Sequence, residues 1–165
     1  MIMQKILLLT LTAFFIATAP LSQVIAATYY VVRHADKQDG DNPMLTAKGV
    51  KRAAHIAKML KDEPIITVYS TETNRTIMTA TPTAADKGVA VELFSTDDLE
   101  GFATHLKSKD GTMLIVAHSS STPDLASLLS GVKIPKLDET DFEQLFKVTI
   151  TDGVASLKKM TTTFE

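Results

Sequence analysis

Four side chains suited to phosphate chemistry follow segments that read as buried strands. Arg33 and His34 come directly after one apolar, β-branched segment, and His118 comes directly after another. Arg75 follows a third such segment and a short polar turn. Ligands bind beyond the carboxyl ends of the strands in open parallel sheets. We therefore expect the two arginines and the two histidines to converge at one edge of a sheet.

This set of side chains suits a phosphoryl group. Arginine offers a planar fork of N–H donors that fits phosphate bidentately, and Arg75 is expected near a helix N-terminus, where anions are favoured. An imidazole can attack phosphorus and carry the phosphoryl group covalently. Two arginines and a second histidine can stabilise the transferred group without a metal. The sequence holds no His-x-His, no HExxH, no Asp-rich calcium loop and no P-loop, so we expect neither a metal nor a cofactor.

Each of these residues also has an ordinary structural interpretation. A single Arg33 or Arg75 is most often a surface ion-pair partner, and a single histidine after a strand, such as His118, is most often a hydrogen-bonded structural residue. His55 and His105 fall on expected helices, and we assign them the structural role. The functional interpretation of His34 and His118 depends on their joint placement.

Strand and helix patterns alternate four times along the chain and then give way to a hairpin. A helix is expected to begin after Thr46, with Val50, Ala54, Ala57 and Leu60 on its apolar face. Asp152-Gly153 is a two-residue hairpin signal. This order predicts a three-layer α/β/α sandwich with a mostly parallel central sheet and a C-terminal hairpin. The expected strands are residues 28–32, 65–69, 89–93 and 113–117, and the hairpin strands are 146–151 and 154–157.

Length and composition set outer bounds on the protein. A chain of 165 residues is one domain in size and can bury a real core. The absence of cysteine excludes a disulfide scaffold, a thiolate metal site and a cysteine nucleophile. With 17 basic and 19 acidic residues, the net charge of −2 makes nucleic acid an unsuitable partner.

The first residues have the pattern of a secretory signal. Lys5 precedes an apolar run over residues 6–18, and Val24-Ile25-Ala26 places small residues where a signal peptidase requires them. Cleavage after Ala26 fits best, cleavage after Ala27 is an alternative, and an uncleaved membrane anchor is the competing interpretation. The apolar run is shorter than the ~20 residues that a membrane span needs, which favours a signal. We expect a signal over residues 1–26 and a single domain over 27–165. We also expect a periplasmic or secreted location and no stable membrane span after cleavage.

Four segments, in order, resemble the motifs of the histidine phosphatase superfamily, the phosphoglycerate mutase-like group. The similarity is greatest to its short bacterial phosphohistidine phosphatases and their exported relatives. Val31-Val32-Arg33-His34-Ala35 resembles the Arg-His-Gly signature, and Leu45-Thr46-Ala47-Lys48-Gly49 resembles the Leu-Thr-x-x-Gly motif. Ser70, Arg75, Thr79 and Ala80 match a Ser-x4-Arg-x3-Thr-Ala pattern, and Val116-Ala117-His118-Ser119 resembles Val-Gly-His-Ser. The resemblance spans residues 29 to about 122.

The resemblance implies a phosphoglycerate mutase-like fold and a phosphatase that acts through a phosphohistidine on His34. Arg33, Arg75 and His118 would line the phosphate pocket, and Ser119 or Ser70 could add hydrogen bonds, although packing or capping suits these serines equally well. His34 must present an unprotonated nitrogen, so its other nitrogen is expected to donate to a backbone carbonyl or a neighbour. A protonated His118 would donate to a phosphate oxygen.

The sequence departs from the family pattern at two points. Ala35 replaces glycine beside the nucleophile, which requires a negative φ and can narrow the pocket. No residue after the third strand clearly matches the family's general acid. The candidates are Asp97, Asp98 and Asp36. The alternative role of Asp97 or Asp98 is to cap a helix, and that of Asp36 is a loop ion pair with Lys37.

A missing acid favours substrates with good leaving groups, because acid–base assistance contributes roughly 10²–10⁴-fold to the rate. We therefore expect an exported, metal-independent phosphatase acting on a phosphomonoester or phosphoramidate carried by a small molecule, a surface or a phosphoprotein. The alternatives are a phosphate-binding module with little catalysis and a coincidental match of the motifs.

Overall fold

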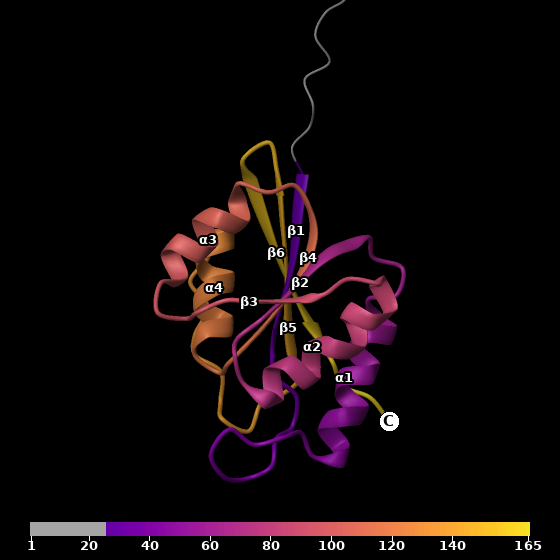
Figure 1. Ribbon diagram of the computed structural model, residues 1–165. Helices are drawn as coiled ribbons and strands as arrows, with labels where there is room; N and C mark the ends of the chain where they lie inside the picture. Colours follow the sequence, from indigo (N-terminus) through magenta and orange to yellow (C-terminus); the bar gives the residue numbers. More distant parts are fainter. Residues whose placement is uncertain (1–25) are drawn as a thin grey trace, which may run out of the picture.

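The computed structural model describes residues 26–165, which form four strand–helix units followed by a hairpin (Figure 1). The predicted α/β/α sandwich is confirmed. The strands are β1 (Ala26–Arg33), β2 (Ile65–Ser70), β3 (Val91–Leu93), β4 (Gly111–Ala117), β5 (Gln144–Thr151) and β6 (Val154–Thr161), and the helices are α1 (Ala47–Met59), α2 (Asn74–Lys87), α3 (Leu99–Lys107) and α4 (Ser121–Ser130).

The six strands form one sheet in the order β3-β2-β4-β1-β5-β6. β1 to β4 are mutually parallel, and the β5–β6 hairpin adds two strands beside β1, with β5 antiparallel to it. β1 is therefore an interior strand, paired on one side with β4 and on the other with β5. Its carboxyl end, and those of β2 and β4, lie at one edge of the sheet.

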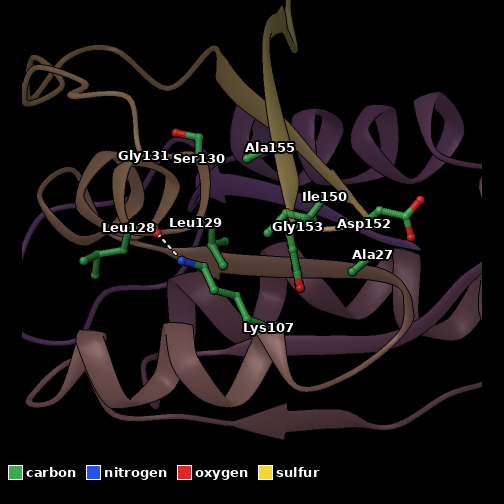
Figure 2. A pocket seen from close by; sticks show the side chains of 11 residues that line it. Ala27, Lys107, Leu128, Leu129, Ser130, Gly131, Ile150, Asp152, Gly153 and Ala155 are labelled. Atoms are coloured by element: carbon green, nitrogen blue, oxygen red, sulfur yellow. Dashed lines mark hydrogen bonds between the residues drawn. The ribbon is translucent and has the colours of Figure 1, made fainter. Parts of the chain in front are cut away.

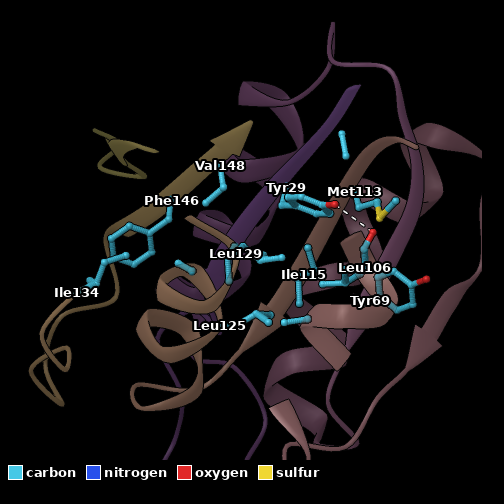
Figure 3. Close-up of a cluster of buried hydrophobic side chains, with 14 of the residues drawn as sticks. Tyr29, Tyr69, Leu106, Met113, Ile115, Leu125, Leu129, Ile134, Phe146 and Val148 are labelled. Carbon is cyan, nitrogen blue, oxygen red and sulfur yellow. Dashed lines mark hydrogen bonds between the residues drawn. The ribbon is translucent and has the colours of Figure 1, made fainter. Parts of the chain in front are cut away.

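Alternate residues of the interior strands enter separate cores on the two faces of the sheet. On one face, Tyr29 and Ile115 pack with the apolar sides of α3 and α4, and the Tyr29 hydroxyl donates a 3.0 Å hydrogen bond to the Leu106 carbonyl (Figure 3). On the other face, Tyr30 and Val116 pack with α1 and α2. Strands buried on both faces read as continuous apolar runs, which is why these segments were recognisable in the sequence.

Several predicted helix and turn signals act as expected. The Thr46 hydroxyl accepts a hydrogen bond from the Gly49 N–H and caps α1, and the Asp98 carboxylate caps α3 in the same way. In the β5–β6 turn, Asp152 and Gly153 both have positive φ, the conformation that a two-residue hairpin of this type requires.

The apolar face of α1 differs from the prediction by about one residue. Val50 is 50 % exposed and Ala54 is also exposed, whereas Ala53, Ile56 and the following Leu60 are buried. The physical reason is Arg52, which is fully buried on the core side of the helix. A pattern based on apolar residues alone cannot anticipate that a charged residue is buried.

The predicted signal segment lies outside the described residues, apart from Ala26, which is the first residue of β1. Its removal and the expected location therefore stay predictions. Within residues 26–165, no helix is both long enough and apolar enough to cross a membrane.

Candidate active site

The register between β1 and β4 places the two histidines together. Arg33 pairs with Ala117 at the carboxyl end of the parallel ladder, and the His34 N–H continues it with a 2.9 Å hydrogen bond to the Ala117 carbonyl. The next residue of each strand is a histidine, and the His34 and His118 rings lie edge to face, 5.7 Å between centroids. The expected convergence at this sheet edge is confirmed.

His34 is held in the form that a nucleophile needs. Its Nδ1 lies 2.9 Å from the Ala35 carbonyl oxygen, which can only accept, so Nδ1 carries the proton and Nε2 keeps its lone pair. Burial, with the charges of Arg33 and Arg75, lowers the pKa of His34 to about 3, against the opposing effect of the Ala35 carbonyl. His34 is therefore neutral at physiological pH, and the predicted backbone partner is confirmed.

His118 is also neutral, and its partners fix its orientation. The Arg75 Nη2, which can only donate, lies 3.4 Å from His118 Nδ1, and His118 Nε2 lies 3.0 Å from the Thr71 hydroxyl. The proton is therefore on Nε2 and points to Thr71. Burial, followed by the charges of Arg75 and Arg33, lowers the pKa of His118 to about 4. A permanently protonated His118 does not fit this arrangement.

Arg33 is almost completely buried beside His34, 1 % exposed. Its Nη1 donates to the carbonyl oxygens of Asp138 and Asp141, at 2.9 and 3.0 Å, and its Nη2 donates to the Glu139 carboxylate at 3.0 Å. The guanidinium carbon lies 4.3 Å from the centroid of the Phe142 ring. The Nε of Arg33, and likewise that of Arg75, is buried with no hydrogen-bond partner among the described residues.

The residues that match the family motifs also hold the loop that begins at His34 in place. The Ala35 N–H donates to the Thr79 hydroxyl at 2.9 Å, and that hydroxyl donates to the Arg75 carbonyl at 2.7 Å. One threonine of α2 therefore links the segments that carry His34 and Arg75. The Ala35 methyl is fully buried against Leu45 and Ala53, so it packs into a small core and does not narrow the pocket.

The segment after Ala35 is fixed against the start of α1. The Thr46 N–H donates to the Asp36 carbonyl at 2.9 Å, and a side chain at position 49 would overlap that same carbonyl oxygen. This close approach explains the glycine of the Leu-Thr-x-x-Gly segment.

The three carboxylates considered as general acids are hydrogen-bonded to groups other than the histidines. Asp36 accepts a 2.7 Å hydrogen bond from the Arg52 Nε and pairs with Lys48, rather than with Lys37 as anticipated. Burial acts to raise the pKa of Asp36, but the Arg52 hydrogen bond and both positive charges outweigh it and lower the pKa. Asp98 caps α3, and Asp97 is exposed and accepts a hydrogen bond from Ser95. Their assignment as acids stays a prediction that these contacts do not favour.

The structure adds three residues that sequence reasoning did not select: Glu139, Phe142 and Thr71. Ser119, expected to bind phosphate, donates a 2.6 Å hydrogen bond to the Glu139 carboxylate. Ser70 is fully buried and donates to the Thr71 carbonyl, a local structural role. Glu139 and Phe142 belong to an irregular segment without periodicity, so no sequence signal identified them.

Two hollows lie at opposite ends of β1. A groove of about 370 Å³ adjoins His118 and is lined by residues of the loops after β2 and β3, including Thr71 and Ser95. A larger hollow, about 560 Å³, lies at the other end, beside Ala27, the end of α4 and the β5–β6 turn (Figure 2). Its basic residue, Lys107, donates to the Leu128 carbonyl at 2.7 Å. Size alone would select the other end of β1, because the smaller groove, and not the larger hollow, is lined by His118, one of the four convergent residues.

No set of three or more His, Asp or Glu side chains within residues 26–165 is arranged to hold a metal ion. The charges that converge on His34 come from Arg33 and Arg75. The arrangement therefore offers an unprotonated imidazole nitrogen beside two guanidinium groups and a second, neutral imidazole. These groups can bind an anion and attack an electrophilic phosphorus.

A comparison with protein-family models matches residues 29–103 to the histidine phosphatase superfamily, branch 1. This stretch contains Arg33, His34 and Arg75. No curated protein matches the sequence significantly.

Solved structures share the fold. A protein histidine phosphatase, SixA, complexed with tungstate superposes with a TM-score of 0.68 at 18 % identity, covering 82 % of this chain and 97 % of that one. A mycobacterial glucosyl-3-phosphoglycerate phosphatase gives 0.64 at 11 % identity, covering 82 % and 98 %. A phosphoglycerate mutase from Bacillus anthracis gives 0.57 at 17 % identity, covering 82 % and 93 %. These likenesses confirm the phosphoglycerate mutase-like fold.

Proposed function

We propose that this chain is a phosphatase of the histidine phosphatase superfamily, as its match over residues 29–103 and its fold support, and that it hydrolyses a phosphomonoester or phosphoramidate through a phosphohistidine on His34. The observation that carries the proposal is the hydrogen bond between His34 Nδ1 and the Ala35 carbonyl. It leaves Nε2 unprotonated beside Arg33, Arg75 and His118, which supports nucleophilic attack on phosphorus.

The reaction proceeds in two displacements. In the first, a bond forms between His34 Nε2 and phosphorus while the bond from phosphorus to the leaving oxygen or nitrogen breaks. The leaving group keeps the bonding electron pair and takes its proton from solvent. In the second, the oxygen of a water molecule attacks the phosphohistidine, the phosphorus–Nε2 bond breaks, and inorganic phosphate departs as the water loses a proton to solvent. His34 returns to its neutral form after each cycle.

The two arginines stabilise the charge on the transferred group. The Nη2 atoms of Arg33 and Arg75 and the unpartnered Nε atoms supply N–H donors to phosphoryl oxygens, and a planar guanidinium suits this geometry. Neutral His118 orients Arg75, because its Nδ1 accepts a hydrogen bond from the Arg75 Nη2. These positive charges support catalysis that does not depend on a metal ion.

The groove beside His118 is open to solvent, which supports a substrate that is only partly enclosed by the protein. The loops after β2 and β4 are short, so a phosphoryl group carried by a small molecule, a surface or a phosphoprotein can approach. Asp36, Asp97 and Asp98 are engaged in other hydrogen bonds, so none is placed as a general acid. This supports substrates whose leaving group needs little protonation, such as phosphoramidates and aryl phosphates. The signal-like residues 1–26 support export to the periplasm or the exterior.

The decisive experiment traps the phosphoenzyme. Purified protein is mixed with an aryl phosphate in the presence of a chelator, and acid-labile phosphate on His34 is located by mass spectrometry after rapid quenching. We expect phosphate release and a phosphopeptide containing His34, both absent from H34A. Full activity in H34A, or loss of all wild-type activity in chelator, would overturn the proposal. If the protein binds phosphate but forms no phosphoenzyme, it is a phosphate-binding module and the proposed catalysis is wrong.

Export has its own test. Fractionation of cells that express the full chain, followed by N-terminal sequencing, is expected to give a periplasmic or secreted protein that begins at Ala27. An intact N-terminus in the cytoplasm would contradict this part of the proposal.

A further inference from the structure

Glu139 makes the contacts of a bound anion while its side chain remains largely in solvent. One carboxylate oxygen accepts a hydrogen bond from Arg33 Nη2 at 3.0 Å, and the other accepts from the Ser119 hydroxyl at 2.6 Å. The Glu139 side chain is nevertheless 78 % exposed, whereas that of Arg33 is 1 % exposed. A solvent-facing carboxylate therefore reaches a buried guanidinium next to the nucleophile.

A phosphoryl group on His34 would require the same donors. Carboxylate and phosphoryl oxygens are both acceptors for a guanidinium fork. The hydrogen bond from Ser119, with the charge of Arg33, lowers the pKa of Glu139, so it is an anion at neutral pH. Two anions at one guanidinium repel each other, and each weakens the binding of the other.

The covering of His34 leads to the same conclusion. His34 is only 3 % exposed, with the rings of His118 and Phe142 against it, at 5.7 and 5.8 Å between centroids. Glu139 and Phe142 belong to the same segment after α4. The segment that carries Glu139 therefore also covers part of the His34 ring.

We propose that Glu139 is an affinity- and specificity-determining residue, an internal anion that competes with the phosphoryl group for Arg33 and Ser119. This inference rests on the proposed function and deepens it. The substrate's phosphoryl group displaces the carboxylate, and the carboxylate returns when inorganic phosphate leaves. The net affinity for substrate is thus the affinity of its phosphoryl group for Arg33 and Ser119 less that of the Glu139 carboxylate. This competition weakens product inhibition by phosphate, and it disfavours the binding of singly charged anions.

The backbone around Glu139 allows such an exchange. Arg33 Nη1 is bonded to the main-chain carbonyls of Asp138 and Asp141, which flank Glu139. Asp138 also accepts hydrogen bonds from the Thr140 N–H and hydroxyl and closes the turn. The main chain therefore stays anchored to Arg33 when the Glu139 side chain rotates into solvent. Such rotations of exposed side chains take place within nanoseconds.

The test measures inhibition by inorganic phosphate in wild type, E139Q and a matched control, E100Q. Glu100 is an exposed glutamate at the start of α3, outside the groove beside His118, and among the described residues its side chain is bonded to neither Arg33 nor Ser119. With an aryl phosphate as substrate, we expect the Ki of phosphate and the KM to fall about tenfold in E139Q, a difference of about 1.4 kcal/mol. We expect kcat to stay within about threefold and E100Q to change Ki by less than threefold.

The remaining outcomes contradict the proposal. An unchanged or higher Ki in E139Q, or an equal fall in E100Q, would show that Glu139 does not compete specifically. A kcat lowered more than tenfold without tighter phosphate binding would make Glu139 a proton-transfer group instead. If folded wild-type protein, checked by circular dichroism, neither binds phosphate nor turns over the substrate, the proposed function itself fails. An active wild type with an unaltered Ki in E139Q overturns this inference alone.

Discussion

Arg33 and Arg52 are both 1 % exposed, yet their surroundings differ in two respects. Arg52 donates through Nε to Asp36 at 2.7 Å, and through Nη1 to the Thr162 carbonyl at 3.1 Å, and its Nη2 lies 3.7 Å from Glu143. All three of its nitrogens have partners. Arg33 also has three acceptors, but its Nε has none, and its carboxylate partner is largely in solvent. A buried arginine with a complete set of internal partners joins elements, whereas one with a spare donor beside a nucleophile can bind substrate.

The matched pair R33K and R52K tests this distinction most strongly. Lysine keeps the charge but lacks the planar fork, so R33K is expected to lower kcat/KM by about 10²–10³-fold, since arginine contacts to a transferred phosphoryl contribute roughly 10³–10⁵ in related chemistry. R52K is expected to change kcat/KM by less than about threefold. Steady-state assays with an aryl phosphate measure both. Similar losses in the two variants would remove the distinction.

The reverse effect is expected in stability. R52M should lower the free energy of unfolding by about 2–4 kcal/mol, because Asp36, whose side chain is 14 % exposed, would lose its main partner, and the Thr162 carbonyl would lose a donor. Urea unfolding followed by circular dichroism measures the change. The double variant R52M/D36N is the control, since it removes the unpaired carboxylate and should recover part of the loss. An R52M protein as stable as the wild type would contradict the structural role.

The groups beside the two arginines should titrate in different pH windows. His34, beside Arg33, has a pKa lowered to about 3, so the unfolded chain binds a proton below about pH 6.5 that the folded chain does not. Stability from His34 is therefore complete above that pH and is lost as the pH falls. Asp36, beside Arg52, also has a lowered pKa, so its contribution is lost only below about pH 4.

This difference can be measured between pH 7 and pH 5. Wild type should lose about 1–2 kcal/mol more unfolding free energy over this interval than H34Q, which lacks the titrating group. A parallel loss in the two proteins would show that His34 is not held neutral by the fold. D36N should behave as wild type over the same interval.

The smallest effect is expected at the outer partner of Arg52. Glu143 is 47 % exposed and its carboxylate lies 3.7 Å from Arg52 Nη2, so E143Q should cost less than about 1 kcal/mol of stability. Urea unfolding at low and high salt measures it, and the difference should shrink as salt is added. A loss as large as that of R52M would show that Glu143, rather than Asp36, holds this arginine.

The residues at the ends of the strands could be predicted from the sequence because strand register is a local and repetitive property. Continuous apolar runs identified β1 and β4, and the parallel arrangement then brought His34 and His118 together. The burial of Arg52 was not predictable, because hydrophobic periodicity treats every charge as solvent-facing. Glu139 was not predictable either. Its position follows from the main-chain carbonyls of an irregular segment that fold onto Arg33, which is a tertiary contact without a sequence pattern.

The position of β1 in the sheet also bears on how the protein folds. The strand that carries Arg33 and His34 pairs with β4 and β5, both of which come much later in the chain. Pairings between segments so distant in sequence form slowly, because closing the long intervening loops costs entropy before the contacts stabilise it. We therefore expect the site around Arg33 and His34 to form late in folding. Partly folded chains are expected to hold native-like α1–β2–α2 structure while remaining inactive, and recovery of activity should lag behind recovery of helical signal during refolding.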